Sequence, residues 1–195
     1  MNTPPNNLQP NNSGSSAAHC LIVEDLPQTA KWLGRVVAQV FPQLQTQYCT
    51  GVQAAKAKLE TYTQPNAPQL DLVLLDLGLP DGCGGDLLPW LAENLPQTIT
   101  VVATIYDDDN HVFKALAAGA KGYLLKDESA EMLAQYLGRI SCGEPPLAPA
   151  IARRILQHFH VAPQNSLNEQ SQAAEFLPSG QALSEGVLSP REAQT

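Results

Sequence analysis

The chain has 195 residues, enough for one domain of ordinary size together with tails, and its apolar fraction of 44% supports a hydrophobic core. The net charge of −8 argues against direct nucleic-acid binding, because phosphate contacts need clustered Lys and Arg side chains. No apolar run reaches membrane-spanning length, and the first residues lack the pattern of a signal peptide, so we expect a cytoplasmic protein with no membrane partner.

Composition divides the chain into five predicted segments. Residues 1–18 are rich in Asn, Pro and Ser, which is typical of a disordered tail. Residues 19–142 alternate apolar runs with amphipathic patterns and form the predicted domain. A short helical pattern indicates a linker helix region at 143–160, and the polar stretch 161–187 reads as a flexible linker. Residues 188–195 contain a capping box with Pro at the first helical position, which is the opening of a further helix.

Five apolar runs in the predicted domain read as strands, and helical periodicity lies between and after them. The strands are expected near residues 19–24, 44–49, 70–76, 98–104 and 121–125. The helical patterns cover residues 32–41, 54–62, 87–95, 112–117 and 132–140. Pro27 suits the first turn of the first helix, Gly119 a left-handed cap and Ser129 an N-cap. We predict an α/β fold, a flavodoxin-like doubly wound parallel sheet of strand order 2-1-3-4-5.

Four of these strands end in a polar side chain. The first ends in Glu24 and Asp25, the third in Asp76, the fourth in Thr104 and the fifth in Lys126. In the predicted order, the carboxyl ends of the first and third strands meet at the topological switch point of the sheet, where ligands bind. We therefore expect these side chains to lie around one crevice.

Three carboxylates in one crevice repel one another unless a cation lies among them. A hard divalent ion such as Mg²⁺ suits them, because it prefers oxygen ligands in octahedral geometry. We expect Glu24, Asp25 and Asp76 to form a Mg²⁺ site, with the backbone carbonyl of Gly78 as a further ligand.

A metal, a carboxylate, an ammonium and a hydroxyl around one point form a phosphoryl-transfer site. Asp76 is the predicted nucleophile, which takes the phosphoryl group as an acyl phosphate. Lys126 is expected to stabilise the equatorial oxygens of the transferring group. Thr104 is expected to hydrogen-bond a phosphate oxygen once the group is attached.

Each of these residues, taken alone, has a more ordinary explanation. Asp25 is a good N-cap for the first helix, Lys126 a solvated strand end and Thr104 a common strand residue. The run Asp107–Asp109 is better explained as a cap of the fourth helix than as a metal cluster, and Asp81 as part of a turn without a chemical role. The functional interpretation is preferred because all four strand ends carry a suitable group at once.

Residues 19–142 resemble the receiver domain of bacterial two-component response regulators, whose fold is CheY-like. The resemblance rests on Glu24-Asp25 and on residues 74–82, 104–108 and 118–126. The stretches 122–127 and 188–192 are similar to the NarL/LuxR-type subfamily, in which the second motif opens a C-terminal helix-turn-helix DNA-binding domain. We expect the chain to carry only the opening of that domain, either as a fragment or as a truncated product.

The resemblance implies that a sensor histidine kinase phosphorylates Asp76. It implies that Mg²⁺ is held directly by Asp25, Asp76 and the Gly78 carbonyl, and through water by Glu24. It also implies a switch, in which Thr104 moves toward the phosphoryl group, Tyr123 turns inward behind it, and the face of the fourth and fifth helices changes its partners.

The resemblance further implies a phosphorylation-dependent homodimer and control of transcription, with DNA contacted only through the missing C-terminal domain. Chemistry is expected at Asp76 alone, as self-phosphorylation and self-dephosphorylation, so the chain is not predicted to be an enzyme. Ile105 is bulkier than the small residue often found in the family at its position, and we expect it to slow the access of water to the acyl phosphate.

Two alternatives remain at this stage. A stand-alone receiver, acting as a phosphate carrier or a dominant-negative partner, fits the acidic site equally well but gives the linker helix and long linker no role. A flavodoxin-like binding protein or small hydrolase fits less well, because no Gly-rich phosphate loop follows the first strand and no serine nucleophile elbow is present.

Overall fold

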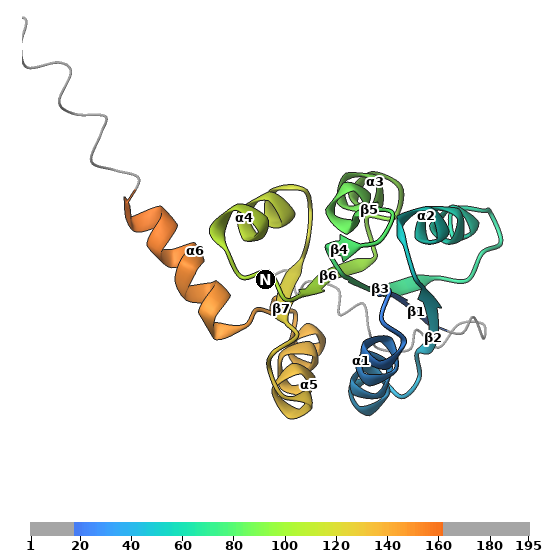
Figure 1. Ribbon diagram of the computed structural model, residues 1–195. Coiled ribbons are helices and arrows are strands. Elements are labelled where there is room, and N and C mark those ends of the chain that lie inside the picture. Colours follow the sequence, from blue (N-terminus) through green and yellow to red (C-terminus); the bar gives the residue numbers. More distant parts are fainter. Residues whose placement is uncertain (1–17, 162–195) are drawn as a thin grey trace, which may run out of the picture. The chain divides into compact units, whose positions relative to one another are not determined.

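The computed structural model describes residues 18–161, which form a three-layer α/β fold (Figure 1). The main sheet contains the strands β1 His19–Val23, β2 Gln45–Cys49, β3 Leu70–Leu75, β6 Ile99–Thr104 and β7 Gly122–Leu125. All of their pairings are parallel, and the order is β2-β1-β3-β6-β7. Taken in chain order, these five strands have the predicted order 2-1-3-4-5, so the predicted fold is confirmed.

Helices cover both faces of the sheet. The described helices are α1 Pro27–Val40, α2 Val52–Thr61, α3 Leu88–Asn94, α4 Asp109–Ala117, α5 Ala130–Gly138 and α6 Pro149–Val161, with 3₁₀ turns at Gly84–Leu87 and Arg139–Cys142. Figure 1 shows α1 and α5 on one face and α2, α3 and α4 on the other. The predicted ends are present: Pro27 begins α1, the Ser129 hydroxyl accepts a hydrogen bond from the Met132 amide, and Gly119 follows α4 with a φ of 106°.

Three strands are fully buried because their sequences are largely apolar on both faces. Every residue of β1, β3 and β7 is buried, and β3 lies in the middle of the sheet. In contrast, β2 reads Gln-Thr-Gln-Tyr-Cys and forms an edge at which most residues remain accessible. A fully buried Leu or Val side chain stabilises a fold by roughly 1.5–3 kcal/mol, so the strand that leads into Asp76 is a rigid support.

A small hairpin follows β3 and was not predicted. It consists of β4 Gly78–Leu79 and β5 Gly82–Cys83, which pair antiparallel around the expected turn. Asp81 in this turn accepts hydrogen bonds from the Val52 amide (2.7 Å) and the Gln53 amide (2.9 Å). It therefore caps α2, whose preceding residue, Gly51, has no side chain to do so. The expectation that Asp81 has only a turn role was incomplete.

The segment that follows α5 pairs through its backbone with β7, the edge strand of the sheet. The Tyr123 amide in β7 donates to the Pro146 carbonyl (2.9 Å), and the Ala148 amide donates to the Tyr123 carbonyl (3.1 Å). The helix α6 follows, and all of it except its last residue lies within the linker helix region predicted at 143–160. None of the described helices combines the length and apolarity that crossing a membrane needs. The predicted tail 1–18 and the segments 161–187 and 188–195 lie outside the described residues, apart from residues 18 and 161.

Candidate functional site

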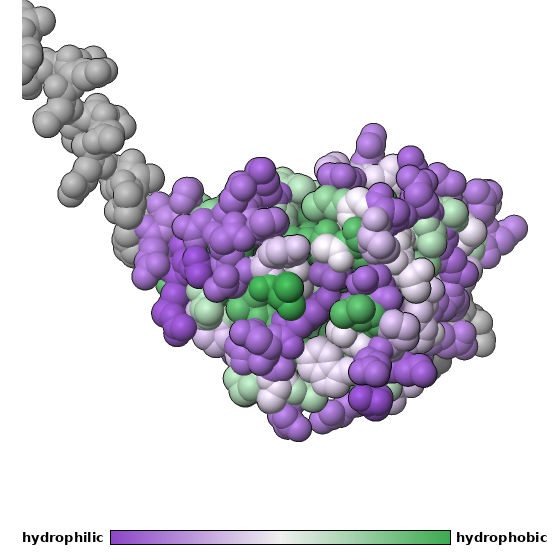
Figure 2. Space-filling model, viewed as in Figure 1, coloured by the Kyte–Doolittle hydropathy of each residue, from purple (hydrophilic) through white to green (hydrophobic). Residues whose placement is uncertain are grey.

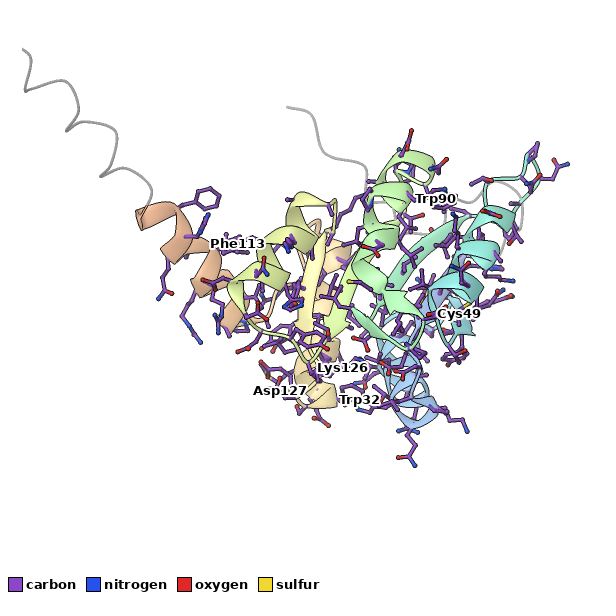
Figure 3. The ribbon with its side chains drawn as sticks, turned by 45° about the horizontal axis from the view of Figure 1, so that its top comes forward. Trp32, Cys49, Trp90, Phe113, Lys126 and Asp127 are labelled. Atoms are coloured by element: carbon purple, nitrogen blue, oxygen red, sulfur yellow. The ribbon has the colours of Figure 1, made fainter. Side chains whose placement is uncertain are left out.

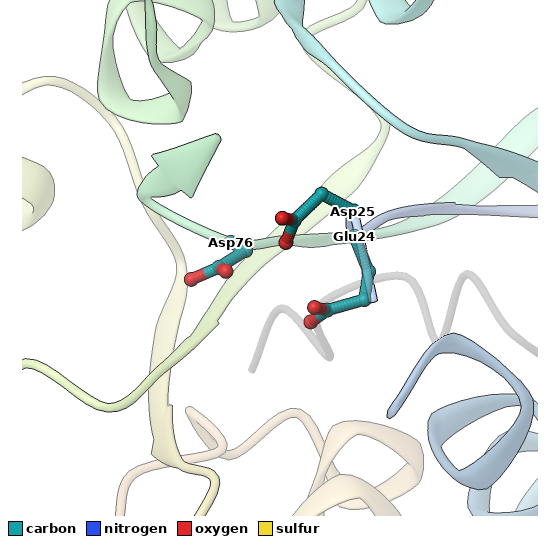
Figure 4. Close-up of side chains that lie close together, drawn as sticks. All are labelled: Glu24, Asp25 and Asp76. Atoms are coloured by element: carbon teal, nitrogen blue, oxygen red, sulfur yellow. The ribbon is translucent and has the colours of Figure 1, made fainter. Parts of the chain in front are cut away.

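The parallel pairing of β1 with β3 brings the three predicted carboxylates together. Val23 is in register with Leu75, and the Asp76 amide donates to the Val23 carbonyl at 3.0 Å. The next residues along the two strands are therefore neighbours. Carboxylate oxygens of Glu24, Asp25 and Asp76 all lie within 4.8 Å of one another (Figure 4).

Lys126 lies at the same edge, immediately after β7. Its side chain is only 10% exposed, and its Nζ lies 2.7 Å from Asp76 Oδ2 and also contacts Glu24 Oε2. Since β6 separates β7 from β3, this side chain reaches across one strand to the carboxylates. The structure thus excludes the explanation of Lys126 as a solvated strand end, and Figure 3 labels its position.

Burial sets the electrostatics of Glu24. The residue is 1% exposed, and this burial raises the pKa of its carboxyl group, although Lys126 and the Leu26 amide oppose the shift. The Leu26 amide donates to Glu24 Oε1 at 3.2 Å. Leu26 is the N-cap residue of α1 and no side chain caps that helix, so the alternative explanation of Asp25 as an N-cap was wrong.

A pocket of about 580 Å³ opens above this cluster. Its polar lining includes Asp25, Asp76, Gly78 and Lys126, and its apolar lining includes Leu26, Trp32, Ile105 and Tyr106. A Cβ atom on Gly78 would come within 3.3 Å of the Tyr106 hydroxyl, so glycine leaves this side of the pocket open. Figure 2 shows apolar side chains in the middle of this hydrophilic face.

The two predicted switch residues lie behind the pocket. Thr104 is completely buried, and its hydroxyl has no hydrogen-bond partner within residues 18–161. Tyr123 is also completely buried, and its hydroxyl donates to the Tyr106 carbonyl at 2.7 Å. Burial raises the pKa of Tyr123, and nearby carboxylates add to the shift. Tyr123 is therefore already buried in this structure, and its predicted inward turn on phosphorylation stays a prediction.

The three consecutive aspartates after β6 divide into two roles. Asp108 caps α4 as predicted, because its side chain accepts from the His111 amide at 3.3 Å. Asp107 and Asp109 instead form ion pairs with Arg154 of α6, at 3.1 and 2.9 Å. These two ion pairs were not predicted.

Tyr106 is a site residue that was not predicted from the sequence. It lines the pocket, its carbonyl accepts the Tyr123 hydroxyl, and its ring stacks on His111 with centroids 4.6 Å apart. The available signal was its place two residues after Thr104, in a loop that leaves the same edge of the sheet.

Comparison with known proteins places this site in a family. A family model described as "Response regulator receiver domain" matches residues 20–138. The transcriptional regulatory protein YhcZ of Bacillus subtilis is 37% identical over 110 residues, which cover 56% of this chain and 48% of that protein. The oxygen regulatory protein NreC of Staphylococcus carnosus is 29% identical over 109 residues, covering 55% and 50%. The chain thus spans about half the length of these NarL-type relatives.

Solved structures agree on the fold. The isolated receiver domain of RcsB from Salmonella enterica serovar Typhimurium, solved with phosphomimetic BeF₃⁻, matches with a TM-score of 0.59 at 16% identity, covering 70% of this chain and 96% of that one. A CheY-like receiver domain protein from Methanospirillum hungatei matches with a TM-score of 0.56 at 23% identity, covering 66% and 96%. With its matched motifs and its CheY-like fold, this chain belongs to the response regulator receiver domain family.

Proposed function

We propose that this chain is the signal-receiving part of a two-component system and that Asp76 accepts a phosphoryl group from a sensor histidine kinase. One observation carries the proposal: Asp76 lies 2.7 Å from Lys126 Nζ in a pocket that two further carboxylates share. Such a concentration of charge at strand ends is costly to fold, and a metal-bound phosphoryl group accounts for it.

The donors present fit Mg²⁺. Three carboxylates within 4.8 Å offer hard oxygen ligands, and the Gly78 carbonyl belongs to a residue that lines the same pocket. We assign Asp25, Asp76 and the Gly78 carbonyl as direct ligands and Glu24 as a ligand through water. When bound, the ion neutralises negative charge on the transferring phosphoryl group.

The protein's own residues then have distinct tasks. A carboxylate oxygen of Asp76 attacks the phosphorus of a phosphohistidine, so that a P–O bond forms, the P–N bond breaks and the imidazole leaves. Lys126 holds the equatorial oxygens, and the buried Thr104 hydroxyl donates to one of them, which gives this hydroxyl the partner that it lacks within the described residues. Water later cleaves the acyl phosphate and regenerates Asp76, so the chemistry is confined to this residue.

We propose that the protein is cytoplasmic and that its phosphorylation controls transcription. Thr104, Tyr106 and Tyr123 connect the phosphoryl site to α4 and β7, so that a new dianionic group on Asp76 changes the surface there. We propose that this change favours a homodimer and acts on DNA through a C-terminal DNA-binding domain. The name of YhcZ as a transcriptional regulatory protein supports this output, and RcsB has been solved as dimers bound to DNA.

The test compares two buried aspartates of the same strand region, Asp76→Asn and Asp71→Asn. Each protein is incubated with acetyl phosphate and Mg²⁺, and its intact mass is measured. We expect the wild type and Asp71→Asn to gain one phosphoryl group and Asp76→Asn to gain none. Equal labelling of Asp76→Asn rejects the assignment.

A further inference from the structure

The helix α6 lies outside the part of the chain that the family model matches, yet it is packed against the domain. Its first turn is anchored, because the preceding Ala148 pairs with Tyr123 of β7, and both Ala148 and Ile151 are completely buried. One face of α6 therefore has a fixed position beside the last strand.

The middle of α6 holds the loop between β6 and α4. Arg154 Nη1 lies 2.9 Å from Asp109 Oδ1, and Arg154 Nη2 lies 3.1 Å from Asp107 Oδ2. One guanidinium thus joins two carboxylates on either side of the Asp108 cap. One turn further along α6, the His158 ring packs against Phe113 of α4 with centroids 4.1 Å apart (Phe113 is labelled in Figure 3).

The same loop leads directly to the proposed phosphoryl site. It begins after Thr104, whose buried hydroxyl has no partner within the described residues, and it contains Tyr106, which lines the pocket. The Tyr106 carbonyl accepts the Tyr123 hydroxyl at 2.7 Å. The loop is therefore held on its inner side by Tyr123 and on its outer side by Arg154.

We propose that Arg154 is a positioning residue for the phosphoryl group on Asp76. It holds the loop that follows Thr104, so that the Thr104 hydroxyl can donate to the phosphoryl group while the Tyr106 carbonyl keeps its hydrogen bond from Tyr123. This inference rests on the proposed function of Asp76. Because coupling is reciprocal, phosphoryl binding in turn strengthens the docking of α6.

The test titrates the full chain with beryllofluoride and Mg²⁺, a non-covalent phosphoryl mimic that needs no kinase. We expect Arg154→Ala to weaken binding by roughly two- to fivefold, because partly exposed ion pairs contribute modestly. The matched control is Arg153→Ala, which removes the same charge from an exposed neighbour on the same helix and should bind like the wild type. Arg154→Lys should recover part of the loss.

A second variant keeps the test sharp if Arg154→Ala lowers stability. The pair Asp107→Asn with Asp109→Asn should weaken binding as Arg154→Ala does, and adding Arg154→Ala to it should cause no further loss. Hydrogen exchange of residues 148–159 should slow on beryllofluoride binding in the wild type and not in these variants.

The outcomes separate the two proposals. If the wild type fails to bind beryllofluoride with Mg²⁺, the proposed function fails and this inference fails with it. If the wild type binds but Arg154→Ala matches Arg153→Ala, only the role of Arg154 is rejected.

Discussion

The central sheet has an amino edge, where its strands begin, and a carboxyl edge, where they end. The two edges carry the same kinds of side chain, but these side chains differ in their hydrogen-bond partners. Three strands have a matching residue near both of their ends, with Asp71 and Asp76 for β3, Thr98 and Thr104 for β6, and Lys121 and Lys126 for β7. The first member of each pair belongs to the amino edge and the second to the carboxyl edge. The difference between the edges therefore arises from surroundings rather than from composition.

At the amino edge the polar groups are satisfied by the protein itself. The Thr98 hydroxyl donates to the Leu70 carbonyl at 2.7 Å. Lys121 Nζ donates to the Pro96 and Thr98 carbonyls at 2.8 and 3.1 Å. Asp71 accepts from the His19 amide, and its partners are complete without a ligand.

At the carboxyl edge the described residues do not supply hydrogen-bond partners for all of the buried polar groups. Three carboxylates lie together, two of them contact one ammonium, and the buried Thr104 hydroxyl has no partner within residues 18–161. Burial alone does not distinguish the edges, because it raises the pKa of Asp71 at one edge as it raises that of Glu24 at the other. What distinguishes them is the supply of hydrogen-bond partners, and the phosphoryl group that we propose would give the Thr104 hydroxyl an acceptor.

The largest expected effect is a difference in phosphorylation rate between variants of the two lysines. Lys126→Ala should slow phosphorylation by acetyl phosphate by on the order of a hundredfold, because it removes a preorganised charge from the transferring group. Lys121→Ala should leave the rate near that of the wild type, because Lys121 binds carbonyls at the opposite edge. Time courses of intact mass measure both rates, and equal rates for the two variants would contradict the comparison.

A smaller effect should separate the two threonines. Thr98→Val removes a buried hydrogen bond and should lower the free energy of unfolding by about 1 kcal/mol. Thr104→Val removes a hydroxyl that has no partner within the described residues, so the free energy of unfolding should stay unchanged or rise. Urea denaturation measures both values. Similar losses for the two variants would mean that Thr104 is satisfied in solution in the same way as Thr98.

Much of the fold and of the site was predictable because the signals are local. Buried parallel strands appear as continuous apolar runs, and each run ends at a polar residue that marks the edge of the sheet. The strand order then brought Glu24, Asp25 and Asp76 together without any further information. Ser129 and Asp108 were recognisable as helix caps because a cap acts within its own first turn.

The interactions that were missed join residues far apart in the chain. Asp81 caps a helix that begins 29 residues earlier, and Arg154 binds carboxylates 45 and 47 residues before it. Periodicity carries no information about such pairs, because each partner alone resembles an ordinary surface charge. The two-residue strands β4 and β5 were missed for a different reason, since they are too short to show alternation.

The change in melting temperature on adding Mg²⁺ tests most directly whether the carboxyl edge binds a ligand. An ion that binds only the native state at ten times its dissociation constant adds about 1.4 kcal/mol, which corresponds to a rise of about 3–6 °C in melting temperature. We predict this rise for the wild type and for Asp71→Asn, and its loss in Asp25→Asn. A melting temperature of the wild type that does not respond to millimolar Mg²⁺ would contradict the account.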